Sequence, residues 1–188
     1  MAIRKIIKKG DPMLSKVSRP VTKFDDKLAA LLDDMRETMY EADGVGLAAV
    51  QVAVLRRAIV IDLGEEQGGV IELINPEILE TGGEQYETEG CLSIPGEYYE
   101  TIRPAYVKLK AQDRYGEWHE YEGTGIKAVC FSHETDHLDG HLFLEHLNPN
   151  PHSEEEQEER LQARRAERAK EQGFNQVNEI ELKTISED

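Results

Sequence analysis

Residues 125–139 read GIKAVCFSHETDHLD, and this stretch decides the fold. Its apolar and histidine side chains recur every three or four positions, which predicts a helix with one distinctive face. That face carries Ile126, Val129, Cys130, His133 and His137. Two histidines four positions apart in a helix can both point imidazole nitrogens at one metal ion, and Glu134 stands beside them. Such a glutamate can take a proton from water and give it to a leaving amine. The alternative is a pair of ordinary surface histidines.

A hydrolytic metal site of the zinc type needs a third protein ligand and an open position. One zinc-protease class uses HExxHxxGxxH, but here Phe143 occupies the final histidine position, and His141 is out of register. Another class uses a downstream glutamate, although a solvated acidic helix start explains the glutamates at 154–159 better. Cys91 is the third candidate, because a thiolate binds zinc(II) or iron(II) well. A lone cysteine is more often a small buried apolar residue, so the residues alone leave the third ligand open.

The segments before this helix predict a mixed fold. Apolar β-rich runs occur at 58–61, 70–74 and 106–110, separated by Gly, Pro and Asp turns. No helix-length crossover lies between these runs, so we expect the strands to pair antiparallel. An amphipathic helix is predicted over residues 25–42. The expected class is α+β, with antiparallel β-sheets packed around a central helix that carries HExxH, plus a charged C-terminal helix.

A change of composition predicts the domain organisation. The chain has 188 residues, of which 39 % are hydrophobic, and this length suits one well-filled core. After Pro149-Asn150-Pro151 the chain becomes rich in Glu and Arg. Ser153 and Glu156 form a capping-box pattern that predicts a helix running to about Gly173. We therefore expect a catalytic domain over 1–150 and a charged helix and tail over 151–188.

Charge and hydropathy narrow the classes of partner. The net charge of −16 argues against broad binding to nucleic acid, so DNA is not expected and any RNA contact must be local. No apolar run approaches the roughly 20 residues of a membrane span. The basic N-terminus lacks the features of a secretory signal, so we expect a cytoplasmic protein. The two cysteines, Cys91 and Cys130, are expected to be thiols.

Three segments together resemble the motifs of peptide deformylases: GVGLAAVQ at 44–51, EGCLS at 89–93 and HETDH at 133–137. They occur in the same order and at fitting separations, and the resemblance covers roughly residues 3–148. It implies that Cys91, His133 and His137 hold one divalent metal ion. Iron(II) is the expected metal in the cell, with zinc(II) and nickel(II) as alternatives. The implied activity is removal of the N-formyl group from the N-terminal formylmethionine of nascent polypeptides, with release of formate.

The resemblance also implies roles for the neighbouring residues. Gln51 and the backbone N–H of Leu92 would form an oxyanion hole, and Glu134 would be the acid and base. An apolar methionine pocket would be lined by Val45, Ile126, Val129 and Cys130. On physical grounds, we expect Gly44 and Gly46 to adopt backbone conformations closed to other residues, beside an extended peptide. Gly90 would allow close backbone approach next to Cys91.

Two further expectations concern residues that hold the ligand histidines and residues that could contact the ribosome. Ligand histidines usually need a partner on their second nitrogen, for which the candidates are Glu89, Asp136 and Arg103. Some bacterial deformylases dock on the ribosome through a C-terminal helix, so Arg160, Arg164 and Arg168 are candidates for ribosome contact. Two other readings stay open: a metallopeptidase with a glutamate ligand, and a binding protein that has lost the reaction.

Overall fold

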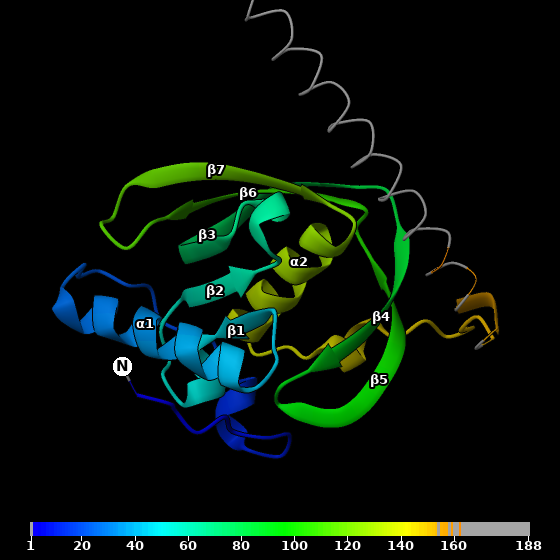
Figure 1. Cartoon of the computed structure of the whole chain (residues 1–188), viewed down its shortest axis with the longest axis horizontal. Helices are drawn as coiled ribbons and strands as arrows, with labels where there is room; N and C mark the ends of the chain where they lie inside the picture. Colours follow the sequence, from blue (N-terminus) through cyan, green and yellow to red (C-terminus); the bar gives the residue numbers. More distant parts are fainter. Residues whose placement is uncertain (1, 154, 158, 160–161, 163–188) are drawn as a thin grey trace, which may run out of the picture. The chain divides into compact units, whose positions relative to one another are not determined.

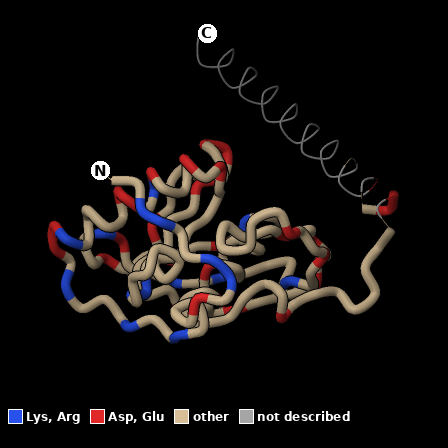
Figure 2. Tube along the Cα trace, turned by 90° about the horizontal axis from the view of Figure 1, so that it is seen from below, with Lys and Arg blue, Asp and Glu red and all other residues tan. Residues whose placement is uncertain are grey.

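A computed structural model describes residues 2–153, 155–157, 159 and 162. The chain divides into two units, residues 1–149 and residues 150–188, and each is described by itself. In the first unit, Asp and Glu positions mark many of the outer turns (Figure 2). Within the described part of the chain, no helix combines the length and the apolar character that crossing a bilayer requires.

The strands of the first unit form a large sheet and a separate hairpin (Figure 1). The sheet has the order β1 (Gly46–Ala48), β2 (Ala58–Asp62), β3 (Val70–Gly82), β6 (Tyr106–Gln112) and β7 (Trp118–Thr124). The hairpin consists of β4 (Gln85–Cys91) and β5 (Ile94–Arg103). Every strand pair is antiparallel, which confirms both the predicted pairing and the α+β class.

Two helices cover the large sheet, and β2 shows why they take opposite faces. Successive side chains of a strand point to opposite sides. Ala58 and Val60 pack in the cluster that contains the apolar face of α1 (Asp26–Glu41). Ile59 and Ile61 pack in the cluster that contains α2 (Ile126–Asp139). Both predicted helices are therefore confirmed, and α2 lies behind the sheet in Figure 1.

Helix α2 differs from the one-faced helix that the sequence suggested. Its buried residues lie on several sides and include Phe131, Thr135 and Leu138 as well as the histidines. The helix ends at Gly140, whose φ is +83° and where a Cβ atom would lie 2.8 Å from the carbonyl carbon of Ser15. Only glycine fits this close crossing of the N-terminal segment over the helix end.

Short 3-10 helices, which periodicity does not reveal, connect the main elements. They are η1 (Pro12–Ser15), η2 (Ala49–Val52), η3 (Glu65–Gln67) and η4 (Phe143–His146).

The prediction that Cys91 lies in a loop was wrong, since Cys91 is the last residue of β4, and Leu92 and Ser93 form the turn to β5.

The second unit begins with the predicted capping interaction. The backbone N–H of Ser153 donates to Oε2 of Glu156 at 2.8 Å, and the N–H of Glu156 donates to Oγ of Ser153 at 3.3 Å. Residues 155–157 are helical. Most of the predicted helix up to Gly173, with Arg160, Arg164 and Arg168, lies outside the described residues.

Candidate metal centre and active site

The hairpin brings Cys91 to the two histidines of α2. The ligand atoms of Cys91, His133 and His137 all lie within 4.8 Å of one another, and this is the one such group within the described residues. Sγ of Cys91 lies 3.3 Å from Nε2 of His137. One thiolate and two imidazoles suit zinc(II), iron(II) or a similar ion, and three ligands leave one position open. The donor set therefore fits a divalent metal, and Cys91 takes the place considered for a downstream glutamate.

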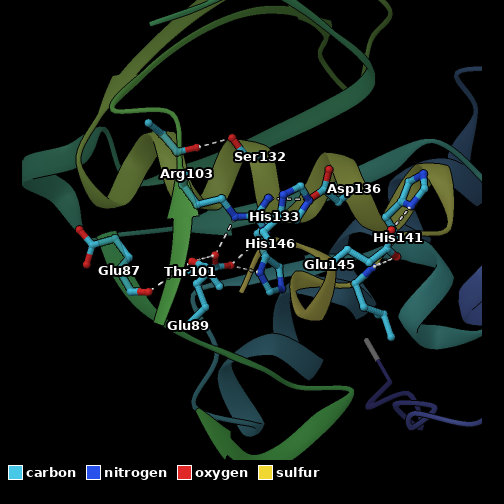
Figure 3. Close-up of polar contacts among 12 residues, drawn as sticks. Glu87, Glu89, Thr101, Arg103, Ser132, His133, Asp136, His141, Glu145 and His146 are labelled. Atoms are coloured by element: carbon cyan, nitrogen blue, oxygen red, sulfur yellow. Dashed lines mark hydrogen bonds and ion pairs between the residues drawn. The ribbon is translucent and has the colours of Figure 1, made fainter. Parts of the chain in front are cut away.

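Behind His133, a buried ionic network holds the imidazole (Figure 3). Nδ1 of His133 lies 2.6 Å from Oε2 of Glu89, whose other oxygen accepts from Nε of Arg103 at 2.7 Å and from the Thr101 hydroxyl. Nη1 of Arg103 lies 2.6 Å from Oδ2 of Asp136. Because a carboxylate accepts the Nδ1 proton, Nε2 of His133 is left for the metal. The structure thus brings together the three predicted supporting residues, Glu89, Arg103 and Asp136.

The network continues from Asp136 towards the surface. Nε2 of His146, in η4, lies 3.0 Å from the Asp136 carboxylate, and the His146 side chain is 38 % exposed. Arg103 is 2 % exposed in its side chain and is held by carboxylates on two sides. Burial alone would raise the pKa of Glu89, but hydrogen bonds from His133 and Arg103 lower it to about 2. Glu89 is therefore a fixed negative charge.

The pKa values of the two ligand histidines are shifted in opposite directions. Burial lowers the pKa of His137 well below its usual value, which keeps this ring in the neutral form that a metal binds. Burial opposes protonation of His133 as well, yet hydrogen bonding to Cys91 and Glu89 raises its pKa to about 10. Metal binding at His133 must therefore release a proton.

In front of the cluster lies a cleft of about 610 Å³. All of the predicted site residues except His137 line it: Val45, Gly46, Gln51, Gly90, Cys91, Leu92, Ile126, Val129, His133 and Glu134. Cys130 also contributes to the lining. A larger hollow of about 720 Å³, bordered by Asp33, Glu72 and Arg114, contains none of the three metal-binding residues.

Glu134 is the least satisfied polar side chain of the cleft. It is 5 % exposed, and its Oε2 has no hydrogen-bond partner among the described residues. Burial raises the pKa of Glu134 to about 7, helped by the nearby charges of Glu89 and Asp136. A carboxyl group with such a pKa can exchange a proton near neutral pH.

Gln51 is fixed in the 3-10 helix η2 with its amide nitrogen towards the cluster. Its Oε1 accepts from the backbone N–H of Ala48 at 2.9 Å. Its Nε2 lies 3.5 Å from Sγ of Cys91 and 3.2 Å from Oγ of Ser93. Because the oxygen is held by the backbone, the amide N–H₂ faces the metal-binding atoms. Ser93 had no role in the sequence prediction, although it belongs to the EGCLS motif.

Three glycines of the cleft, Gly44, Gly46 and Gly90, are explained by space and not by a positive φ. The expectation that Gly44 and Gly46 have unusual conformations was wrong, since neither has a positive φ. A Cβ at Gly44 would lie 2.6 Å from Cδ1 of Leu92, and one at Gly46 would overlap the Glu134 carboxylate. At Gly90, it would lie 2.5 Å from the ring of Tyr98. A side chain at Gly46 would therefore displace Glu134 directly.

The N-terminal segment, which carries none of the three motifs, also contributes to the cleft. Lys8 lines the cleft, and its Nζ donates to the carbonyl oxygen of Leu92 at 2.7 Å. The contact joins residues 84 positions apart, so no local pattern indicated it.

Comparison with known proteins agrees with this geometry. The family model described as polypeptide deformylase matches residues 3–153. The chain belongs to the peptide deformylase family. A deformylase of Agathobacter rectalis is 53 % identical over 145 residues, covering 77 % of this chain and 90 % of the relative. Peptide deformylase 1 of Clostridium acetobutylicum is 55 % identical over 147 residues, covering 78 % and 96 %.

Solved deformylase structures share the fold. The enzyme of Thermotoga maritima superposes with a TM-score of 0.76 at 43 % identity, covering 79 % of this chain and all of that one. The enzyme of Legionella pneumophila gives a TM-score of 0.75 at 46 % identity, covering 79 % and 88 %. The family match ends at residue 153, so most of the charged tail lies beyond it.

Proposed function

We propose that this deformylase removes the formyl group from N-formylmethionyl peptides by the combined action of Glu134, Gln51 and Leu92 beside the Cys91–His133–His137 centre. The observation that carries the proposal is the cluster of three ligand atoms within 4.8 Å at the base of a cleft that Glu134 and Gln51 also line. Water is consumed, the formyl C–N bond breaks, and formate and a free α-amine are released.

The residues around the metal centre divide the chemistry between them. When bound, a divalent metal supplies Lewis-acid chemistry, by polarising the formyl carbonyl and making water a better nucleophile. Glu134 accepts the proton of the attacking water and gives it to the leaving nitrogen. The Gln51 amide and the Leu92 backbone N–H donate to the oxygen that becomes negative. Gln51 is suited to this role because Ala48 already fixes its orientation.

The apolar part of the cleft would take the methionine side chain. Ile126, Val129 and Cys130 project from the first turns of α2, and Val45 lies on the segment leading into β1. The extended peptide backbone would lie beside the strand ends at Gly46 and Gly90, which both line the cleft. The proposed substrates are formylmethionyl peptides of new polypeptide chains, which places the reaction in the cytoplasm.

The proposal also covers the identity of the metal and a role for the charged C-terminal tail. The thiolate and imidazole ligands accept iron(II), zinc(II) or nickel(II), and we expect iron(II) in the cell because metal availability often decides which ion fills such a site. Docking on the ribosome through Arg160, Arg164 and Arg168, on a helix continuing to about Gly173, stays a prediction. These arginines lie outside the described residues.

The test measures formate release from formyl-Met-Ala-Ser by protein purified anaerobically and loaded with iron(II), zinc(II) or nickel(II). Acetyl-Met-Ala-Ser is the matched control, since it offers the same peptide with a bulkier acyl group. We expect rapid release of formate and little cleavage of the acetyl peptide. Absence of formate with every metal would reject the proposed function.

A further inference from the structure

A basic segment stands out in an otherwise acidic protein. Residues 1–24 contain seven basic side chains and one acidic one, a net charge of +6, which leaves −22 for the other 164 residues. Figure 2 shows Lys and Arg positions spaced along the lower left edge of the body. Residues 1–24 are therefore strongly basic, whereas the rest of the chain is strongly acidic.

Four exposed cations of this region form what we call the basic edge: Lys16, Arg19, Lys23 and Arg56. None of the four has a salt-bridge partner among the residues that the structure describes. Two acidic side chains near the edge are engaged elsewhere. Asp139 pairs with Arg57 at 2.5 Å, and Asp25 caps α1.

The backbone of the basic edge is held in an extended form. The N–H of Arg19 donates to Leu55 O at 3.2 Å, and the N–H of Arg57 donates to Arg19 O at 2.9 Å. This pairing is a parallel bridge that sets Arg19 beside Arg56. The side chain of Asn75 bonds both the N–H and the C=O of Val21, at 2.8 and 2.9 Å.

Two buried residues between the cations attach this segment to the rest of the fold. Ser18 and Val21 are buried, and the N–H of Ser18 donates to Leu138 O at 2.7 Å. At the rise of an extended chain, Lys16, Arg19 and Lys23 are spaced by about 10 and 13 Å. The fold therefore fixes the backbone positions of these cations, and their exposed, unpaired side chains are free to turn towards a phosphate.

We propose that the basic edge binds the phosphate backbone of RNA. A line of cations touches a thin polyanion along its length while the acidic remainder of the molecule stays clear of it. A membrane is a plane, so anionic lipids would also meet the acidic surface, and the exposed apolar residues of the edge, such as Val17, include no aromatic anchor. Two of the four cations are arginines, whose forked donors match phosphate oxygens.

The basic edge is separate from the catalytic centre. It adjoins the C-terminal end of α2 through Ser18 and Leu138, whereas the cleft lies beside Ile126, Val129 and His133. The proposal does not depend on the deformylase reaction, and changes at the edge leave the residues of the cleft in place.

The test measures binding of a fluorescently labelled single-stranded RNA 20-mer to the full-length metal-loaded protein at low salt. The variant K16Q/R19Q/K23Q/R56Q should bind on the order of tenfold more weakly. It should also have a shallower dependence of log Kd on log salt, by roughly 0.7 for each phosphate that the variant no longer neutralises. The smaller variant R19Q/R56Q should show an intermediate loss, and formate release from formyl-Met-Ala-Ser should be unchanged in both.

The matched control is K108Q/K110Q, which removes two positive charges that are already paired with Glu77, Glu120 and Glu122. It should bind RNA as the parent does. Equal weakening by K108Q/K110Q and R19Q/R56Q would reduce the effect to net charge and overturn the proposal. The proposal would also fail if RNA binding were lost only in R160Q/R164Q/R168Q, or if the edge variants abolished binding to phosphatidylserine vesicles and left RNA binding intact.

Discussion

Glu89 and Glu134 are two carboxylates next to His133, one in contact with its ring and one adjacent in the chain, and both are 5 % exposed. Burial acts on both carboxyl groups, yet the pKa of Glu89 falls to about 2 while that of Glu134 rises to about 7. The difference lies in their partners. Glu89 receives hydrogen bonds from Arg103 and His133, whereas Oε2 of Glu134 has none from the described residues. We call the network of Glu89, Arg103 and Asp136 the closed side of the centre, which holds a fixed charge, and we call Glu134 and Gln51 the open side, where Glu134 can exchange a proton.

Removing the ligand between the two sides should have the largest effect. We expect Cys91→Ala to bring formate release from formyl-Met-Ala-Ser to background, because two imidazoles alone hold a metal poorly at a three-ligand site. Metal content after dialysis should fall in parallel. Near-normal formate release in this variant would show that Cys91 is not a required metal ligand and that another residue, such as a glutamate, completes the site.

Removing the cation of the closed side, Arg103, should lower the stability of the fold. Arg103→Met removes the shared partner of the buried Glu89 and the partly exposed Asp136, and breaking a buried ion pair costs about 3–5 kcal/mol of folding free energy. Urea unfolding of the zinc form measures the loss. The matched control, Lys110→Met, removes a half-exposed cation and should cost less than about 1 kcal/mol. Equal losses in the two variants would show that the network adds nothing beyond a surface pair.

On the open side, Gln51 should affect the reaction and not the fold. Gln51→Ala should lower kcat by roughly 10²–10³, about 3 kcal/mol of transition-state stabilisation, with a smaller change in KM. Metal content is expected to stay at one ion per chain. A rise in KM at constant kcat would instead assign Gln51 to binding of the ground state.

The outer end of the closed network should matter least. His146→Gln removes a 38 % exposed partner of Asp136, so its effect on stability should stay below about 1 kcal/mol. Metal affinity, measured by competition with a chelator, should change by less than about threefold. A larger change would mean that Arg103 depends on His146 for its position.

The sequence predicted the parts of the centre that local spacing determines. HExxH placed two ligands on one helix, α1 followed from periodicity, and β2, β3 and β6 followed from their β-rich runs. Thr101, Ser93, Lys8 and His146 were missed, because each meets its partner across a fold contact that no motif announces. The conformation of Gly44 and Gly46 was inferred from residue type. Their real constraint, the side chains of Leu92 and Glu134, comes from distant segments.

The most direct test of the two-sided account compares Glu89→Gln with Glu134→Gln in the cobalt(II) form. Cobalt(II) affinity and the thiolate-to-cobalt absorption band report the metal site, and formate release per bound cobalt reports the reaction. We expect Glu134→Gln to keep the affinity and the band and to lose about 10²–10⁴ in activity. Glu89→Gln should lose about 10- to 100-fold in affinity and keep most of its activity per bound cobalt. The reverse pattern, with metal lost in Glu134→Gln and retained in an inactive Glu89→Gln, would contradict the account.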